Sequence, residues 1–70
     1  MLTGKRFRLE RATLVIDYAG DRPHARTIPL GSVLEVEVGP RDGDGLVDVI
    51  WDGNVYSMFE EDLKARGTEL

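Results

Sequence analysis

The sequence contains no cysteine and only one histidine, His24. Without cysteine, neither a disulfide nor a thiolate metal site can stabilise the fold, so stability must come from burial of apolar side chains. Ser32 and Ser57 have no cysteine or second histidine with which to build a nucleophilic site, and no glycine-rich stretch has phosphate-binding spacing. The sequence therefore favours a non-catalytic protein, and we expect no cofactor and no metal.

Long apolar runs are also missing from this 70-residue chain. A chain of this length forms one domain, and such a domain buries only about 60% of the surface that its unfolded chain exposes. No stretch approaches the roughly 20 apolar residues needed to span a bilayer. The basic residues near the N-terminus are not followed by the apolar segment of a secretory signal. We expect a single domain over residues 1–70, located in the cytoplasm, without a membrane partner.

The net charge is −4, but its distribution along the chain is uneven. Residues 1–26 contain six basic and three acidic residues, whereas residues 27–70 contain three basic and ten acidic residues. One interpretation is a nucleic-acid-associated module that uses the basic N-terminal strand, with the candidate residues Lys5, Arg6, Phe7, Arg8 and Arg11. The other is that basic outer positions of early strands pair with acidic positions of late strands. We favour the second, because the acidic part of the chain weakens phosphate binding.

The rest of the chain is organised around the stretch from Leu46 to Phe59. Two β-rich runs flank Asp52-Gly53-Asn54, which has the residues that a tight turn with positive φ requires. The stretch therefore predicts a β-hairpin. The side chains that alternate on one face are Val47, Val49 and Trp51 on the first arm and Val55, Ser57 and Phe59 on the second. This alternation predicts a core that contains Val36, Val47, Val49, Trp51, Val55 and Phe59.

Alternation of polar and apolar residues predicts further strands over residues 5–9, 13–18, 24–28 and 32–38. In the last of these, Leu34, Val36 and Val38 are expected to point inward. Residues 39–45 contain three glycines and a proline, which predicts a loop. Residues 60–63 predict one helical or 3₁₀ turn, and residues 68–70 a short closing strand.

This pattern predicts an all-β fold: a small, strongly bent antiparallel barrel of five or six strands with one short helical turn near the C-terminus. The hairpin Val-Asp-Val-Ile-Trp-Asp-Gly-Asn-Val-Tyr (residues 47–56), followed by Phe-Glu-Glu-Asp-Leu (residues 59–63), resembles the Val-x-Val-x-Trp/Tyr-x-Asp-Gly…Tyr…Asp-Leu pattern of Tudor-like members of the SH3-like barrels. The segment 28–32 is similar to small uncharacterised bacterial proteins of that shape. The resemblance covers roughly residues 28–66 and implies an SH3-like barrel, a fold that carries many unrelated functions.

The candidate binding residues lie on the same hairpin: Trp51, Tyr56, Met58 and Phe59. The resemblance implies that Trp51 and Tyr56 could form a cage for a methylated cation; the alternative is that Trp51 and Phe59 belong to the core. We predict a small protein-interaction or assembly module in which Tyr56, Met58 and Phe59 meet an unidentified protein or peptide, or a second copy.

The segment from Val55 to Met58 is expected to form a sheet edge without charged residues that would prevent pairing with another strand. This favours a weak homodimer through the Tyr56/Met58 face. The alternative is a monomer in which that face is covered by residues 60–63 and the first hairpin.

Overall fold

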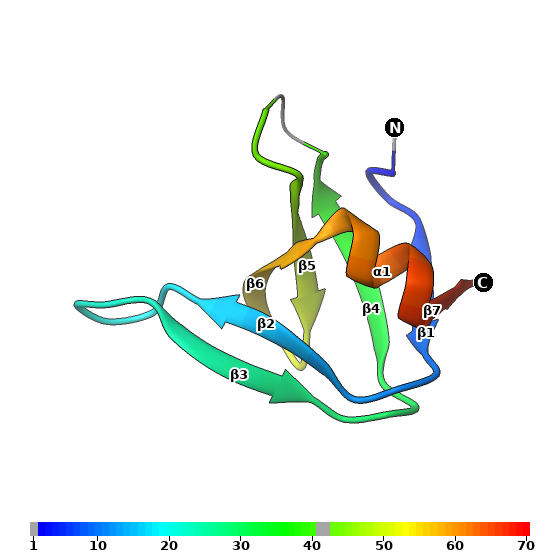
Figure 1. Ribbon diagram of the computed structural model, residues 1–70, viewed down its shortest axis with the longest axis horizontal. Helices are drawn as coiled ribbons and strands as arrows, with labels where there is room; N and C mark the ends of the chain where they lie inside the picture. Colours follow the sequence, from blue (N-terminus) through cyan, green and yellow to red (C-terminus); the bar gives the residue numbers. More distant parts are fainter. Residues whose placement is uncertain (1, 41–42) are drawn as a thin grey trace.

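A computed structural model describes residues 2–40 and 43–70 and shows a mostly antiparallel β-sheet with one short helix (Figure 1). In chain order, the elements are β1 (Arg6–Leu9), β2 (Thr13–Asp17), β3 (His24–Ile28), β4 (Val33–Val38), β5 (Leu46–Trp51), β6 (Asn54–Phe59), α1 (Glu60–Arg66) and β7 (Gly67–Glu69). The predicted all-β class is thus confirmed, with seven strands in the described residues rather than the expected five or six.

The strands form a single sheet in the order β3-β2-β6-β5-β4-β1-β7. β1 pairs with both β4 and β7, which brings the first and last strands side by side. In the described part of the chain, β3 and β7 each pair with one neighbour only. The sheet is therefore open, and its pairing does not close it into a barrel. The β2–β3 hairpin extends from one end of the sheet, at the left of Figure 1.

The predicted central hairpin is present as β5 and β6, joined by a two-residue turn. Asp52 and Gly53 both have positive φ, 51° and 76°, as a turn of type I′ requires. The turn sets the register, with Trp51 opposite Asn54 and Val49 opposite Tyr56. The turn chemistry that was read from the sequence is therefore confirmed.

The prediction of which β6 side chains face the core is wrong. Because the turn has two residues, each odd-numbered residue of β5 lies opposite an even-numbered residue of β6. Val47 therefore shares its face with Met58, and Val49 shares its face with Tyr56. Met58 and Tyr56 are buried, whereas Val55 and Phe59, which were expected in the core, are about half exposed, at 48% and 52%.

The core lies between the inner faces of these strands and α1. Its buried hydrophobic members are Phe7, Leu9, Val15, Ile28, Leu34, Val36, Val47, Val49, Tyr56, Met58 and Leu63. Trp51, which was expected to be largely buried, is partly buried and packs against this cluster. Ser57 is also buried, and its hydroxyl donates a hydrogen bond of 2.8 Å to Asp48.

Val38 was expected to point inward, and this prediction is also wrong, because the side chain is 45% exposed. The pairing of β4 with β5 is irregular here: Val36 lies opposite Val49, but Val38, not Glu37, lies opposite Asp48. An extra residue in one strand reverses the alternation of its side chains beyond the irregularity. Leu34 and Val36, which precede it, are fully buried as predicted.

The helix α1 is longer than the predicted turn and contains seven residues. Acidic residues fill its first turn and basic residues its last, which suits the helix dipole. Its buried residue, Leu63, anchors it to the core, and the backbone N–H of Gly67 donates to the Leu63 carbonyl where β7 begins. Among the residues described, no helix is long and apolar enough to cross a membrane.

Candidate functional site

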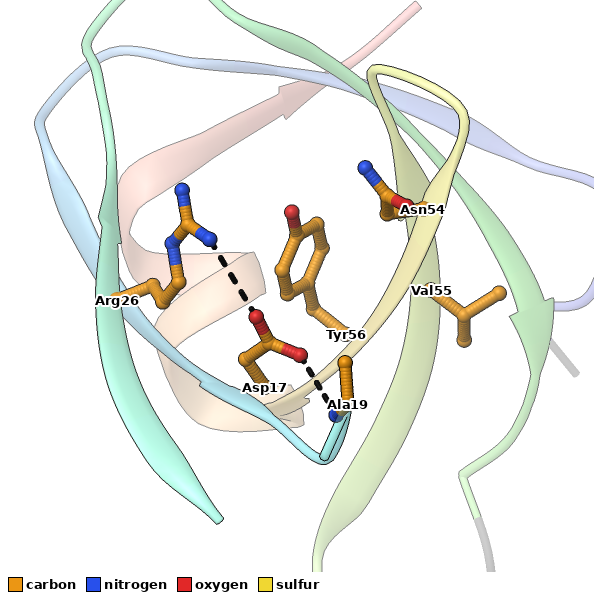
Figure 2. A pocket seen from close by; sticks show the side chains of 6 residues that line it. All are labelled: Asp17, Ala19, Arg26, Asn54, Val55 and Tyr56. Atoms are coloured by element: carbon orange, nitrogen blue, oxygen red, sulfur yellow. Dashed lines mark hydrogen bonds and ion pairs between the residues drawn. The ribbon is translucent and has the colours of Figure 1, made fainter. Parts of the chain in front are cut away.

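The β2–β3 hairpin has a hollow on each side, and the first is a polar recess of about 410 Å³. This recess lies between the hairpin and the start of β6 (Figure 2), and it is lined by Asp17, Ala19, Arg26, Asn54, Val55 and Tyr56. Cross-strand pairing between β2 and β3 places Asp17 near Arg26, although they are nine positions apart in the sequence.

Asp17 and Arg26, the charged pair in the recess, differ in their hydrogen bonding and in their exposure to solvent. The Asp17 carboxylate accepts a 2.8 Å hydrogen bond from the Ala19 backbone N–H through Oδ1, and its Oδ2 lies 3.4 Å from Nη1 of Arg26. The Asp17 side chain is only 15% exposed, whereas that of Arg26 is 54% exposed. Asp17 thus contacts one edge of the guanidinium, and the other N–H donors of Arg26 have no partner among the described residues.

The aromatic ring of Tyr56 forms part of the recess wall while it remains 4% exposed. Its ring centroid lies 6.1 Å from that of Trp51, at an interplanar angle of 48°. In the described part of the chain, the Tyr56 hydroxyl makes no hydrogen bond. Every fully buried side-chain nitrogen or oxygen there has a hydrogen-bond partner, so this hydroxyl is not fully buried. The hydroxyl therefore reaches solvent at the recess, on the side towards which the Arg26 guanidinium also points (Figure 2).

The second hollow is an apolar groove of about 250 Å³ between β2 and the start of α1. It is lined by Leu14, Val15, Ile16, Ala25, Ser57, Met58, Phe59 and Asp62. Leu14 and Phe59 are large hydrophobic side chains with exposures of 63% and 52%. A further hollow lined in part by Thr27 and Arg66 shares Leu14 and Asp62 with this groove and extends it along α1.

The four predicted binding residues do not form one cluster. Tyr56 lines the recess and has Trp51 packed against it, while Met58 and Phe59 line the groove. Sequence reasoning missed Asp17, Arg26 and Leu14. The predicted first hairpin could have indicated these residues. Pairing of residues 13–17 with 24–28 puts Val15 opposite Arg26 and Leu14 opposite Thr27.

The predicted sheet edge at residues 55–58 is wrong, because β6 lies between β2 and β5. Ile16 of β2 is directly opposite Ser57 of β6. Tyr56 and Met58 are consequently buried within one chain, so the exposed face that was expected to join two copies is absent. This arrangement matches the alternative in which the first hairpin covers that face.

The basic residues of the N-terminal strand lie beside acidic residues. Lys5 is 3.6 Å from Glu69, and Arg6 lies opposite Glu35 on β4. Arg8 is 3.9 Å from Glu10, and Arg11 is exposed. Lys5 and Arg6 therefore lie beside an acidic residue of a neighbouring strand, whereas the acidic neighbour of Arg8 lies two residues further along the same segment.

Phe7, the aromatic member of the nucleic-acid candidate set, is 4% exposed. A base stacks only on a ring whose face is open to solvent. The ring of Phe7 instead belongs to the hydrophobic core.

Within residues 2–40 and 43–70, no group of three or more histidine, aspartate or glutamate side chains is placed to hold a metal ion. Comparisons with protein-family models, with curated proteins and with solved structures gave no match.

Proposed function

We propose that this chain is a small, non-catalytic protein-interaction module that binds a partner segment in the groove beside β2. The observation that carries the proposal is the exposure of Leu14 and Phe59, two large hydrophobic side chains that line one apolar hollow. Contiguous exposed apolar surface on a small domain is typical of an interaction site. An apolar patch with a polar rim is the usual anatomy of such a surface.

For the fold, we propose an SH3-like arrangement. The support is the short antiparallel strands, the adjacency of β1 and β7, and the position of the helix α1 immediately before the last strand. The fold does not select a ligand, because one architecture carries many functions. The partner must therefore be inferred from the chemistry of the groove.

Charge at the rim of the groove indicates a basic, apolar partner segment. Asp62 lines the groove, and its neighbour Glu61 is exposed. Glu60 is partly neutralised by Lys64, with 3.3 Å between the charged atoms. A segment that places an apolar side chain between Leu14 and Phe59 and a lysine or arginine near Asp62 would satisfy both features.

Selection from a displayed random peptide library tests this proposal. We expect the selected peptides to combine apolar residues with lysine or arginine. Leu14→Ser and Phe59→Ser should each weaken their binding by about tenfold, the effect of losing one buried apolar contact. Val38→Ser is the matched control, because Val38 is 45% exposed but lies outside the groove.

Two results would contradict the groove proposal. One is that Val38→Ser weakens binding as much as the groove variants do. The other is selection of acidic or uniformly polar peptides. Binding of a single-stranded oligonucleotide that falls steeply with salt and is lost in Arg6→Gln or Arg11→Gln would instead favour the nucleic-acid interpretation.

A further inference from the structure

We infer that the polar recess between the β2–β3 hairpin and β6 binds a carboxylate group, through the guanidinium of Arg26 and the hydroxyl of Tyr56. This site is separate from the apolar groove and is argued from different residues, so either proposal can fail without the other.

The first reason is the unpaired hydroxyl of Tyr56. Only 4% of the surface of Tyr56 is exposed, and that exposed part includes the hydroxyl oxygen, which faces the recess. A phenol whose ring is buried normally finds a hydrogen-bond partner for its hydroxyl. In the described part of the chain Tyr56 has none, so the recess presents a fixed donor without an acceptor.

The second reason is the orientation of Arg26. Its Nη1 is held by Asp17, which is itself held by the Ala19 backbone N–H. A guanidinium that is anchored on one edge loses less conformational freedom when its other edge binds a ligand. Its free N–H groups form a planar fork that matches the two oxygens of a carboxylate.

The charges around the recess favour a singly charged anion over a cation or a phosphate. Both oxygens of Asp17 are engaged, and its side chain is only 15% exposed, so it offers little to a cationic ligand. Among the residues that the structure describes, Arg26 is the one cation that lines the recess, and it is already balanced by Asp17. A phosphate with nearly two negative charges would meet greater repulsion from Asp17 than a carboxylate would.

A carboxylate can come from the C-terminus of a partner chain or from an aspartate or glutamate side chain. Small probes separate these sources. N-acetylglycine mimics a C-terminal carboxylate, and the α-amide of N-acetylglutamate presents only a side-chain carboxylate. N-acetylglycinamide is the neutral control, and inorganic phosphate is the competing anion.

The experiment is a titration of the ¹⁵N-labelled protein with each probe, followed by amide chemical shifts. We expect saturable, low-millimolar binding of at least one carboxylate probe, with the shifts concentrated at Ala19, Arg26 and Tyr56. The carboxylate probe that binds more tightly identifies the source. N-acetylglycinamide should give no saturable shifts, and phosphate should bind more weakly than the carboxylates.

Two variants in the recess and one control variant test whether Arg26 and Tyr56 bind the carboxylate. Arg26→Gln should weaken carboxylate binding by about tenfold or more, because it removes a charged donor. Tyr56→Phe keeps the buried ring, so it should retain the dispersed spectrum and weaken binding by about threefold to tenfold. Arg22→Gln removes the same charge from the hairpin outside the recess and should bind as the parent protein does.

The inference is overturned if neither carboxylate probe gives saturable shifts, or if the amide control or phosphate binds as tightly. Unchanged affinity in both Arg26→Gln and Tyr56→Phe would also overturn it. So would an equal loss in Arg22→Gln, since that result would reflect net charge alone.

Discussion

Replacement of Met58 by glutamate is expected to unfold the protein, whereas the same replacement at Val55 leaves it folded. Met58 is 1% exposed and lies opposite Val47, which is fully buried. A carboxylate placed there has no partner within the apolar core, and the expected loss of unfolding free energy is on the order of 3–5 kcal/mol. That loss approaches the whole stability of a small domain.

Val55 provides the matched control because it lies on the same strand and is 48% exposed. Val55→Glu should reduce the unfolding free energy by less than about 1 kcal/mol, as an ordinary surface change does. Urea unfolding followed by the fluorescence of Trp51, the single tryptophan, measures both variants. A larger loss in Val55→Glu than in Met58→Glu would mean that β6 presents its other face to the core.

Gly39→Ala is expected to have the second large effect. Gly39 has φ of +128°, and a Cβ atom there would lie 2.9 Å from Cγ1 of Val47 and 3.0 Å from its Cα. Backbone strain and overpacking therefore act together, and we expect a loss of about 2–5 kcal/mol in unfolding free energy. Urea or thermal unfolding measures this loss.

Gly20→Ala separates the two causes. Gly20 also has positive φ, +89°, but a Cβ atom there would meet no other atom within 4 Å. This variant should lose only the cost of the left-handed backbone conformation, about 1–2 kcal/mol. If Gly39→Ala were no less stable than Gly20→Ala, the close approach of Gly39 to β5 would be refuted.

Local sequence signals predicted most strands and the central turn, but they did not predict which face of β6 is buried. Val55, Ser57 and Phe59 alternate as convincingly as Tyr56 and Met58 do. The choice between them depends on register, and the two-residue turn at Asp52 and Gly53 sets that register. Counting across the turn could have supplied the answer.

The sequence gives no comparable indication that the side chain of Val38 points outward rather than into the core. The alternation of residues 34–38 is regular in sequence, and the irregularity arises where β4 pairs with β5. Bulges of this kind depend on the partner strand, so one strand's pattern does not reveal them.

The candidate site was harder to predict than the strands because it depends on long-range placement. Leu14, Ile16 and Tyr18 form an apolar series in sequence, yet Val15 is the buried residue and Leu14 is 63% exposed. The position of β2 against β6 decides this, and no local pattern encodes that position. The unpaired hydroxyl of Tyr56 likewise becomes visible only when all neighbouring donors and acceptors are placed.

The placement of the β2–β3 hairpin against β6 is the central claim, because it creates the recess on one side and the groove on the other. The pairing of Ile16 with Ser57 carries this placement. The most direct test is a nuclear Overhauser spectrum of the labelled protein. We predict contacts between the backbone protons of Ile16 and Ser57, together with contacts between β2 and β3. A spectrum in which β2 contacts β3 but shows no contact with β6 would contradict the account.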